Sequence, residues 1–467
     1  METIYATAKV CVKNKCNMSL EPDLVNVLKK ERDYDILKEA WTSWRQQCGR
    51  KMKYLYQDYV RMANEIAMKN SVTGFKFNDY GEYWLFNYES SDIKEQVNNI
   101  WQEIEEFYKD LHAFVRMKLR VIYGDKMPKD GTIPAHLLGD MWAQTWANIL
   151  DEITPFKHLP SLNTDVAQNM RLMHINQTQM FKLAESFFVG IGLDYLPESF
   201  WKRSMFKKPD DRQVMCHAAA WDFKKNSDFR IRQCAQIEME DLIIAHHEMG
   251  HIQYYILYKD QPFVLREGAN PGFHEAIGDL IALSVSTPGH LEALGFLKNY
   301  EDSYAALINF QLNMALQKIA FLPFSYLVDL WRWAVFAGNI SSDHYNRKWW
   351  ELRIRYQGVS PPVKRTEDDF DPGSKYHFHK ALCSLANQTV LYKCDLVGNE
   401  IVGQKLKEVL SQGWSEPWQK QLKQLTNSDL SAQPMLEYFE PLRQYLKDQI
   451  QGENVGWQNN GTRFLFD

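Results

Sequence analysis

The feature that most constrains this chain is a six-residue stretch, His-His-Glu-Met-Gly-His, at residues 246–251. Within it, His247, Glu248 and His251 form the pattern His-Glu-x-x-His. On an α-helix, residues four apart lie on one face, about 6 Å apart along the axis, so two such imidazoles can bind one Zn²⁺. Glu248 follows the first imidazole and can act as general base toward a water molecule that the metal activates. The mostly apolar residues 241–245, without Gly or Pro, predict a buried helix here.

Two simpler interpretations of this motif compete with a zinc site. Three fixed residues at this spacing arise by chance in about one chain in a hundred of this length. A core helix with hydrogen-bonded histidines would look similar, but it would not need two histidines with a glutamate between them. We therefore favour a zinc site over both alternatives.

The third ligand narrows the class of metal site. A metzincin would carry a third histidine six residues after His251, but Leu257 stands there, and Tyr254 replaces the expected glycine. Catalytic His₂Glu sites instead take a glutamate from a following helix. Glu275 lies 24 residues after His251 (275 − 251), and Asp279, one helical turn later, can accept a hydrogen bond from a ligand imidazole. Three protein ligands leave one zinc position open for catalysis.

Length and charge limit the remaining possibilities. The 467 residues suffice for one large domain or two to three small ones. The zinc motif occurs once and no internal repeat is visible, so we expect a single domain over residues 1–467. A net charge of −5 without a basic run argues against a nucleic-acid partner.

Cysteines and glycosylation signals indicate in which cellular compartment the protein is located. The chain has seven cysteines, and it has Asn-x-Ser/Thr sequons at Asn17, Asn176, Asn339, Asn387 and Asn460. Its first residues lack the charged and apolar regions of a signal peptide, and no apolar run approaches the ~18 residues of a membrane span. The chain is therefore either cytosolic, with plain buried thiols, or an N-terminally incomplete form of a secreted protein.

Hydrophobic periodicity predicts a mainly α fold with few short strands. Helical patterns cover most of residues 18–70, 92–122, 164–205, 305–336, 343–357, 403–412 and 433–450, and another helix is expected to begin at residues 135–146. Residues 216–221 alternate loosely, like a short edge strand. No strand–helix–strand alternation is visible.

Several longer blocks carry a family resemblance. They are residues 5–11, 133–139, 246–253, 266–275 and 331–333. In these blocks the sequence closely resembles the angiotensin-converting enzyme family of gluzincin-type zinc dipeptidyl carboxypeptidases, nearly end to end. The resemblance implies a two-lobed, helical ellipsoid with a deep central groove and zinc at its floor. It also implies secretion, glycosylation and oligopeptide substrates.

The resemblance also implies a role for each motif residue. His247, His251 and Glu275 match the zinc ligands of the family, and Glu248 matches its catalytic base. Asp279 matches an acid that orients a ligand.

Further matches concern substrate binding. His217 and Ala218 match residues that hydrogen-bond the substrate backbone, whereas Gln144 and Lys375 match groups that hold its C-terminal carboxylate. An enzyme that removes dipeptides needs a cation at a fixed distance from zinc to measure two residues from the end. His377 matches a histidine that stabilises the tetrahedral intermediate.

The remaining matches concern chloride and disulfides. Arg45, Trp349 and Arg353 match a chloride site of the family. The implied disulfides are Cys11–Cys16, Cys216–Cys234 and Cys383–Cys394, which leaves Cys48 free.

The chain departs from the family in two places. By this resemblance, the chain is expected to begin inside the family's domain, without its N-terminal lid helices. After His377 it continues directly with Phe378, where family members have a further segment several helical turns long. That segment normally carries an oxyanion-binding Tyr, a carboxylate-binding Tyr and the Arg of a second chloride site, for which Tyr88 would be the partner.

Two functions are therefore compatible with the sequence. The first is a zinc peptidase that releases C-terminal dipeptides. The second is a catalytically impaired, truncated isoform that binds zinc or a peptide without turnover. The intact zinc motif favours the first, and the missing segment favours the second.

Restoring a family-like segment after His377 is expected to raise peptide hydrolysis. Loss of one oxyanion donor alone lowers kcat by about 10²–10³, and loss of a carboxylate-binding group raises KM. The measurement compares kcat/KM and melting temperature between the chain and its restored form. Equal values for both forms would show that the segment has no role.

Overall fold

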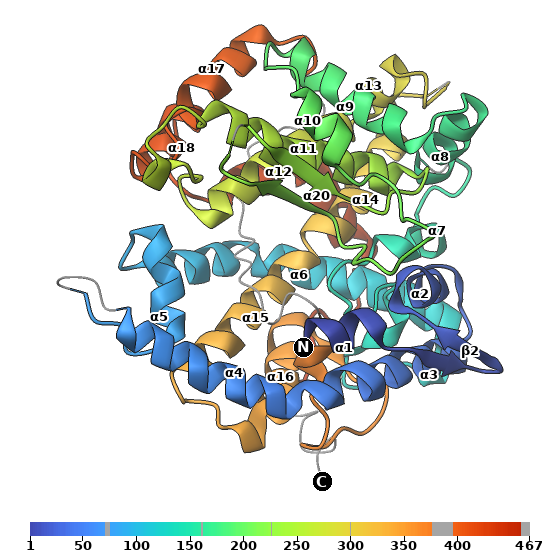
Figure 1. Ribbon diagram of the computed structural model, residues 1–467. Helices are drawn as coiled ribbons and strands as arrows, with labels where there is room; N and C mark the ends of the chain where they lie inside the picture. The colour runs from blue at the N-terminus through green and yellow to red at the C-terminus, as the bar shows by residue number, and fades with distance from the viewer. Residues whose placement is uncertain (71–74, 160–161, 226, 299, 376–395, 459–467) are drawn as a thin grey trace. The chain divides into compact units, whose positions relative to one another are not determined.

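The computed structural model describes the chain except for residues 71–74, 160–161, 226, 299, 376–395 and 459–467. The described residues are mainly α-helical, as predicted from the sequence (Figure 1). Their strands form three two-stranded sheets, with β1 pairing β2, β3 pairing β6, and β4 pairing β5. The chain divides into two compact units, and each is described by itself. The ellipsoid with a central groove stays a prediction.

Unit 1 comprises residues 1–155, 308–383 and 440–467. Its helices are α1 (Glu2–Thr7), α2 (Val25–Lys30), α3 (Tyr34–Trp44), α4 (Arg50–Lys69), α5 (Tyr80–Leu85), α6 (Ile93–Tyr123), α7 (Leu150–Ile153), α15 (Phe321–Phe336), α16 (Tyr345–Leu352) and α20 (Glu440–Gln449). Its strands are β1 (Val10–Val12), β2 (Lys15–Met18), β3 (Ile133–Pro134) and β6 (Val359–Ser360). Two π-helical turns continue α3 and α16, at Arg45–Gly49 and Arg353–Gln357.

The core of unit 1 is built around buried tryptophans. Trp44, Trp331 and Trp350 are fully buried, and each indole N–H finds an acceptor. The acceptors are the carbonyls of Ser374 and Tyr345 and the carboxylate of Asp371, which lie at 2.9, 3.0 and 2.6 Å respectively. A hydrogen bond to the indole N–H removes the cost of burying that polar group, so these contacts help to fix how the helices pack.

Unit 2 comprises residues 156–307 and 384–439. Its helices are α8 (Leu162–Leu172), α9 (Gln177–Gly190), α10 (Glu198–Arg203), α11 (Met239–Leu257), α12 (Pro271–Val285), α13 (Pro288–Ala293), α17 (Glu400–Leu410), α18 (Trp418–Thr426) and α19 (Gln433–Tyr438). Strands β4 (Ala219–Asp222) and β5 (Phe229–Arg232) form an antiparallel hairpin. Helix α14 (Tyr304–Lys318) carries the chain from unit 2 into unit 1.

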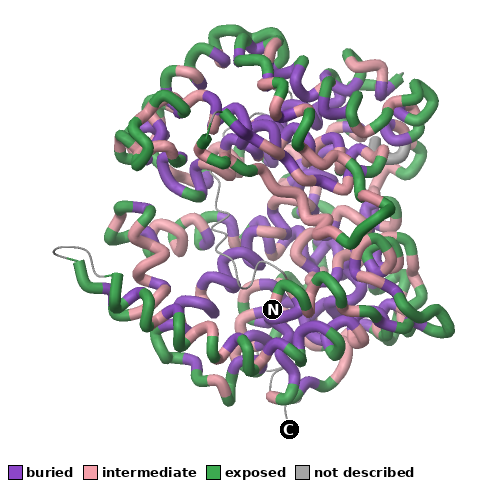
Figure 2. The backbone as a smooth tube through the Cα atoms, viewed as in Figure 1, coloured by how far each residue is buried: buried purple, intermediate pink, exposed green. Residues whose placement is uncertain are grey.

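Apolar side chains from three helices support the start of α11. Met239 and Leu242 pack with Val166 and Met170 of α8, Met180 of α9 and Leu291 of α13, all at most 3% exposed. Long buried stretches also run along α11 and α15 in the tube view (Figure 2). The helix that carries the sequence motif is therefore anchored at its N-terminal end by apolar packing.

Two of the sequence-based element predictions, at residues 92–122 and 216–221, are confirmed, and the one for residues 164–205 is corrected. The pattern at 92–122 is the single helix α6, which ends where Gly124 takes a positive φ of 54°. Residues 164–205 contain three helices instead of the two expected, because the chain turns after Leu172 and again before Pro197. The edge strand expected at 216–221 is β4, at Ala219–Asp222.

The helix predicted from residue 135 is wrong. Only Ala135–Leu137 form a short 3-10 turn, after which Gly139 and Ala143 take positive φ angles of 74° and 52°. The carboxylate of Asp140 accepts hydrogen bonds from the backbone N–H groups of Trp142 and Gln144, at 2.9 and 3.0 Å. This local side-chain acceptor competes with helical hydrogen bonding.

One stretch passes a test for membrane spans by length and composition. It is Tyr304–Phe336, which contains α14 and α15, and 78% of its most apolar window is buried inside the protein. Core helices of globular proteins commonly pass this test.

Candidate metal centre and active site

Local sequence features explain where the two helices that carry the site begin. Helix α11 is buried along most of its length, and Glu240 and Asp241 occupy its first turn, where negative charge is favourable. Helix α12 begins with Pro271, and the side chain of Asn270 caps it by accepting the N–H of Phe273 at 2.6 Å. Each helix therefore starts at a defined residue, which fixes which side chains face the other helix.

A pair of glycines brings α11 and α12 into close contact. A Cβ atom on Gly250 would lie 3.1 Å from the Cα of Gly278, and a Cβ on Gly278 would lie 2.8 Å from the ring of His247. Neither position has room for a larger residue without movement of the backbone or the imidazole. The missing side chains let α12 approach closely enough for its carboxylates to reach the histidines of α11.

His247, His251 and Glu275 come together at this contact. The Nε2 atoms of the two histidines are 3.1 Å apart, and Oε2 of Glu275 lies 3.3 Å from His247 Nε2 and 3.7 Å from His251 Nε2. Ligands at about 2.0–2.1 Å from a tetrahedral Zn²⁺ are about 3.3 Å from one another. The donor set and its spacing therefore fit a zinc ion.

The charges around His247 favour a cation at this place. Nδ1 of His247 lies 3.2 Å from Asp279, which leaves Nε2 directed at the cluster. Burial opposes the charged form of His247, but hydrogen bonds with Asp279 and Glu275 outweigh it and raise its pKa to about 10. Burial lowers the pKa of His251 to about 4, so His251 is neutral, as a metal ligand must be.

Glu248 lies on the same helix, between the two histidines in sequence, and is only 8% exposed. Burial raises the pKa of its carboxyl to about 7, against the opposing charge of His247. A buried carboxylate beside a metal cluster is well placed to accept a proton from water.

One residue of the site was not singled out from the sequence. Nδ1 of His274 lies 2.7 Å from Nδ1 of His251, on the side opposite the cluster. Burial and the neighbouring His251 hold the pKa of His274 well below its ordinary value. Its position directly before Glu275 gave no signal, because only the packing of α12 on α11 turns it toward His251.

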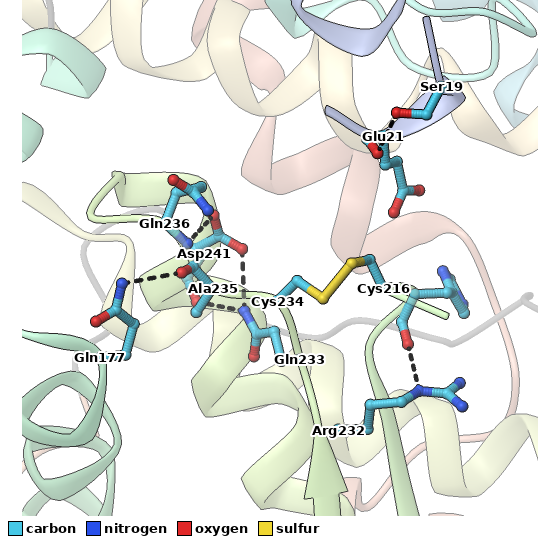
Figure 3. The surroundings of a disulfide bond; sticks show 11 residues. Ser19, Glu21, Gln177, Cys216, Arg232, Gln233, Cys234, Ala235, Gln236 and Asp241 are labelled. Atoms are coloured by element: carbon cyan, nitrogen blue, oxygen red, sulfur yellow. Dashed lines mark hydrogen bonds between the residues drawn. A yellow bond between two sulfur atoms is a disulfide. The ribbon is translucent and has the colours of Figure 1, made fainter. Parts of the chain in front are cut away.

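A disulfide joins the two ends of the β4–β5 hairpin in unit 2. Cys216 bonds Cys234 (Figure 3). Nε of Arg232 donates to the carbonyl of His217 at 3.2 Å. Just after β5, the side chain of Gln233 donates to the carboxylate of Asp241 in the first turn of α11, at 3.0 Å (Figure 3). The segment with His217 and Ala218 is thus tied to the metal-binding helix.

In unit 1, the structure brings together the two residues matched to carboxylate binding. Nζ of Lys375 donates to Oε1 of Gln144, and it lies 4.4 Å from the ring centre of Trp142. Burial lowers the pKa of Lys375 to about 8, although Asp140 and Glu21 partly oppose the shift.

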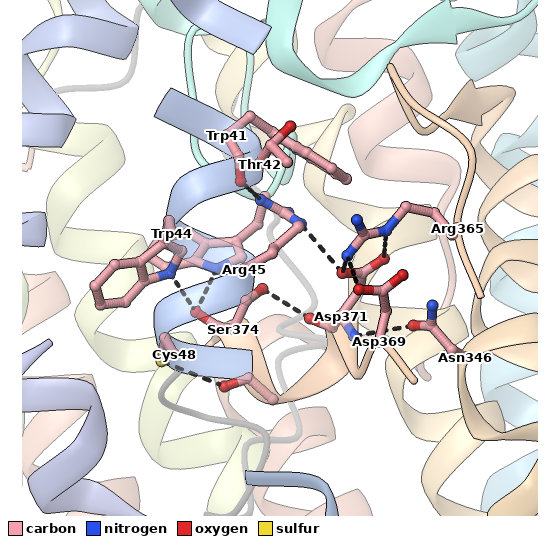
Figure 4. A network of polar contacts seen from close by, with 12 residues as sticks. Trp41, Thr42, Trp44, Arg45, Cys48, Asn346, Arg365, Asp369, Asp371 and Ser374 are labelled. Carbon is pink, nitrogen blue, oxygen red and sulfur yellow. Dashed lines mark hydrogen bonds and ion pairs between the residues drawn. The ribbon is translucent and has the colours of Figure 1, made fainter. Parts of the chain in front are cut away.

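Arg45 and Arg353 form a second polar centre of unit 1, and each is the first residue of a π-helical turn. Arg45 is 4% exposed, and its guanidinium lies 3.6 Å from the ring centre of Trp41. Its Nε lies 3.8 Å from Asp371, which is already held by Arg365 (Figure 4). Burial lowers the pKa of both arginines to about 9, and for Arg45 the charges of Arg365 and Arg353 add to this shift.

Some of the other residues matched to the family lie within the described part of the chain, and the rest lie outside it. Trp349 is buried and lies under the guanidinium of Arg353, at 5.8 Å from the ring centre. The disulfide Cys11–Cys16 is present, Cys48 is a buried free thiol, and Asn17, Asn176 and Asn339 are exposed. His377, the pair Cys383–Cys394, and the sequons at Asn387 and Asn460 lie outside the described residues.

Fold and site together define a mainly helical protein with a candidate His₂Glu metal centre on two consecutive helices. The sequence model of the angiotensin-converting enzyme family matches residues 1–457. Angiotensin-converting enzyme of Mesocricetus auratus is 46% identical over 98% of this chain, and that of Theromyzon tessulatum is 44% identical over 94%. The chain belongs to the angiotensin-converting enzyme family.

The relatives are longer than this chain, to different degrees. The chain spans about a third of the first curated relatives it matches, 36% of the Mesocricetus auratus protein, and 74% of the Theromyzon tessulatum protein. The Mus musculus angiotensin-converting enzyme-like protein Ace3 is also similar, at 40% identity over 99% of the chain.

Replacing Gly278 by Ala tests the close approach of the two helices. The new methyl group collides with the imidazole of His247, so zinc affinity should fall by about 10–100-fold, as when a group that orients a ligand is lost. Competition with a chromophoric chelator measures the affinity.

Gly289→Ala is the matched control, because a Cβ on Gly289 in α13 meets nothing within 4 Å. Alanine favours a helix over glycine by about 1 kcal/mol, so neither change weakens its own helix. Equal zinc affinity in the two variants would contradict the proposed role of the glycine contact.

Proposed function

We propose that this chain is the catalytic domain of a zinc-dependent dipeptidyl carboxypeptidase, which releases dipeptides from the C-termini of oligopeptides. The observation that carries the proposal is the cluster of His247, His251 and Glu275, with Glu248 buried on the same helix. Membership of the angiotensin-converting enzyme family supports this reaction over other uses of a His₂Glu site.

The residues of the cluster would divide the chemistry among them. His247, His251 and Glu275 would hold Zn²⁺, which supplies a Lewis acid that polarises the scissile carbonyl and activates water. Glu248 would take the proton from the attacking water and pass it to the nitrogen of the leaving dipeptide. Asp279 would keep Nε2 of His247 aimed at the cluster through its contact with Nδ1.

Substrate contacts are proposed for both units from the family resemblance. In unit 2, His217 and Ala218 directly precede the short strand β4, where an extended peptide can bond a strand edge through backbone groups. In unit 1, Lys375 and Gln144 form a cation and amide pair of the kind that binds a carboxylate. His377 is proposed to stabilise the oxyanion.

Chloride is proposed as the ligand of Arg45 and Arg353, with Trp349 beside them. The Nε atoms of both arginines are buried without a hydrogen-bond partner among the described residues. Asp371 compensates Arg45 only in part, because Arg365 and Trp350 already occupy its oxygens. A small anion would offset the excess positive charge and satisfy these donors.

An extracellular location is proposed for the protein. The disulfides Cys11–Cys16 and Cys216–Cys234 are typical of oxidising compartments. The sequon residues Asn17, Asn176 and Asn339 are all exposed, as N-glycosylation requires.

The rate of peptide hydrolysis by this chain distinguishes an active peptidase from the alternative, a catalytically impaired isoform. The alignment with the Mesocricetus auratus protein runs over 482 positions, more than the 467 residues of the chain. That relative therefore has internal residues without a counterpart here, in keeping with the segment expected after His377.

His251→Ala is expected to abolish stoichiometric zinc, because it removes one of three protein ligands. Metal analysis of the purified protein measures this. His246→Ala serves as the control, since His246 lies on the same helix but bonds the carbonyl of Leu242. Unchanged zinc content in the His251 variant would refute the ligand assignment.

Glu248→Gln should retain zinc but lose about 10²–10⁴ of kcat, because an amide cannot accept the proton of water. Steady-state hydrolysis of a tripeptide, together with metal analysis of the same sample, tests this. Turnover close to that of the unmodified chain would show that Glu248 is not the base.

A further inference from the structure

The two histidines of the cluster contact different groups through their Nδ1 atoms, which face away from the cluster. His247 contacts the carboxylate of Asp279 through Nδ1, at 3.2 Å. His251 instead contacts another imidazole, with its Nδ1 2.7 Å from Nδ1 of His274. The Nε2 atom of His251 faces His247 and Glu275, so its two ring nitrogens have separate tasks.

The contact between the two rings determines where their protons lie. Two nitrogens 2.7 Å apart share one proton, so one donates and the other accepts. A metal needs the lone pair of His251 Nε2, which places the ring proton of His251 on Nδ1. Nδ1 of His274 must then be the acceptor, and His274 carries its own proton on Nε2.

We propose that His274 is a positioning residue for the metal centre, which fixes the orientation and tautomer of His251 by accepting its Nδ1–H. The inference rests on the proposed zinc site and adds to it a group that contacts no metal. Such supporting acceptors typically contribute 10–100-fold to metal affinity.

The surroundings of His274 hold its ring in place for this role. Its ring centre lies 4.5 Å from that of Tyr254 and 4.9 Å from that of Tyr255. A Cβ on Gly268 would lie 2.9 Å from Cδ2 of His274, so the loop before α12 closes over the ring. The hydroxyl of Tyr254 accepts the N–H of Ala269 at 3.0 Å and ties this loop to α11. The ring is therefore confined from several sides.

A neutral acceptor also suits the charge of the site. Glu275 and Asp279 already provide two carboxylates within reach of the histidines, enough to balance the charge of a divalent ion. A carboxylate in place of His274 would add a further negative charge to a mostly buried site that already holds Glu248 as well, at a cost in desolvation. An imidazole accepts the same hydrogen bond without that charge.

Two substitutions of His274 separate the hydrogen bond from the packing of the ring. In His274→Asn, the amide oxygen can occupy the place of Nδ1 and accept from His251, whereas in His274→Gln the amide lies near the place of Nε2. Both variants are polar and lack the ring. Dissociation constants for Zn²⁺ would be measured by chelator competition for the wild-type chain and both variants, with melting temperature recorded for the apo and zinc-loaded forms.

The Gln variant should bind Zn²⁺ about 10–100-fold more weakly than the wild-type chain, and the Asn variant should recover most of the loss. If zinc affinity is unchanged in the Gln variant, or falls equally in both variants, the positioning role is overturned. If the wild-type chain itself binds no Zn²⁺, the proposed zinc function fails as well. If the wild-type chain binds Zn²⁺ and the two variants have equal affinities, only the role of His274 is overturned.

Discussion

The approach of α12 to α11 is the contact on which the whole site depends. A metal cluster needs ligand atoms about 3.3 Å apart, and here the side chains that supply them come from two helices whose backbones lie in close contact. Gly250 and Gly278 remove the Cβ atoms that would hold the helices apart. Two glycines, which have no side chains, therefore make room for the proposed zinc site.

A chain of supports behind the cluster gives it a single geometry. Asp279 and His274 each hold one imidazole from behind, and the apolar cluster of α8, α9 and α13 fixes the first turn of α11. The hairpin of β4 and β5 is tied to that same turn through Gln233 and Asp241. The proposed peptide-binding segment before β4 is thereby linked to the helix that carries His247 and His251, so a shift of one would affect the other.

Buried charge shapes unit 1 in a different way. Arg45 and Arg353 lie at the start of π-helical turns, which widen the helix locally and recur at functional sites. Their pKa values fall because burial opposes the charged form, and for Arg45 the charges of Arg365 and Arg353 add to the shift, with Asp371 only partly compensating. The unit tolerates this arrangement if an anion completes it, so the proposed chloride would act as part of the core.

The sequence by itself determined what local periodicity can encode. Helix α6 and the His-Glu-x-x-His face of α11 follow from a 3.6-residue repeat, so their residues could be named in advance. The turn at Asp140 escaped prediction, because a single carboxylate captured two backbone N–H groups. Only the tertiary structure decided that His274 faces His251 and that Gly278 makes room for His247, since contacts between helices depend on packing that no local pattern records.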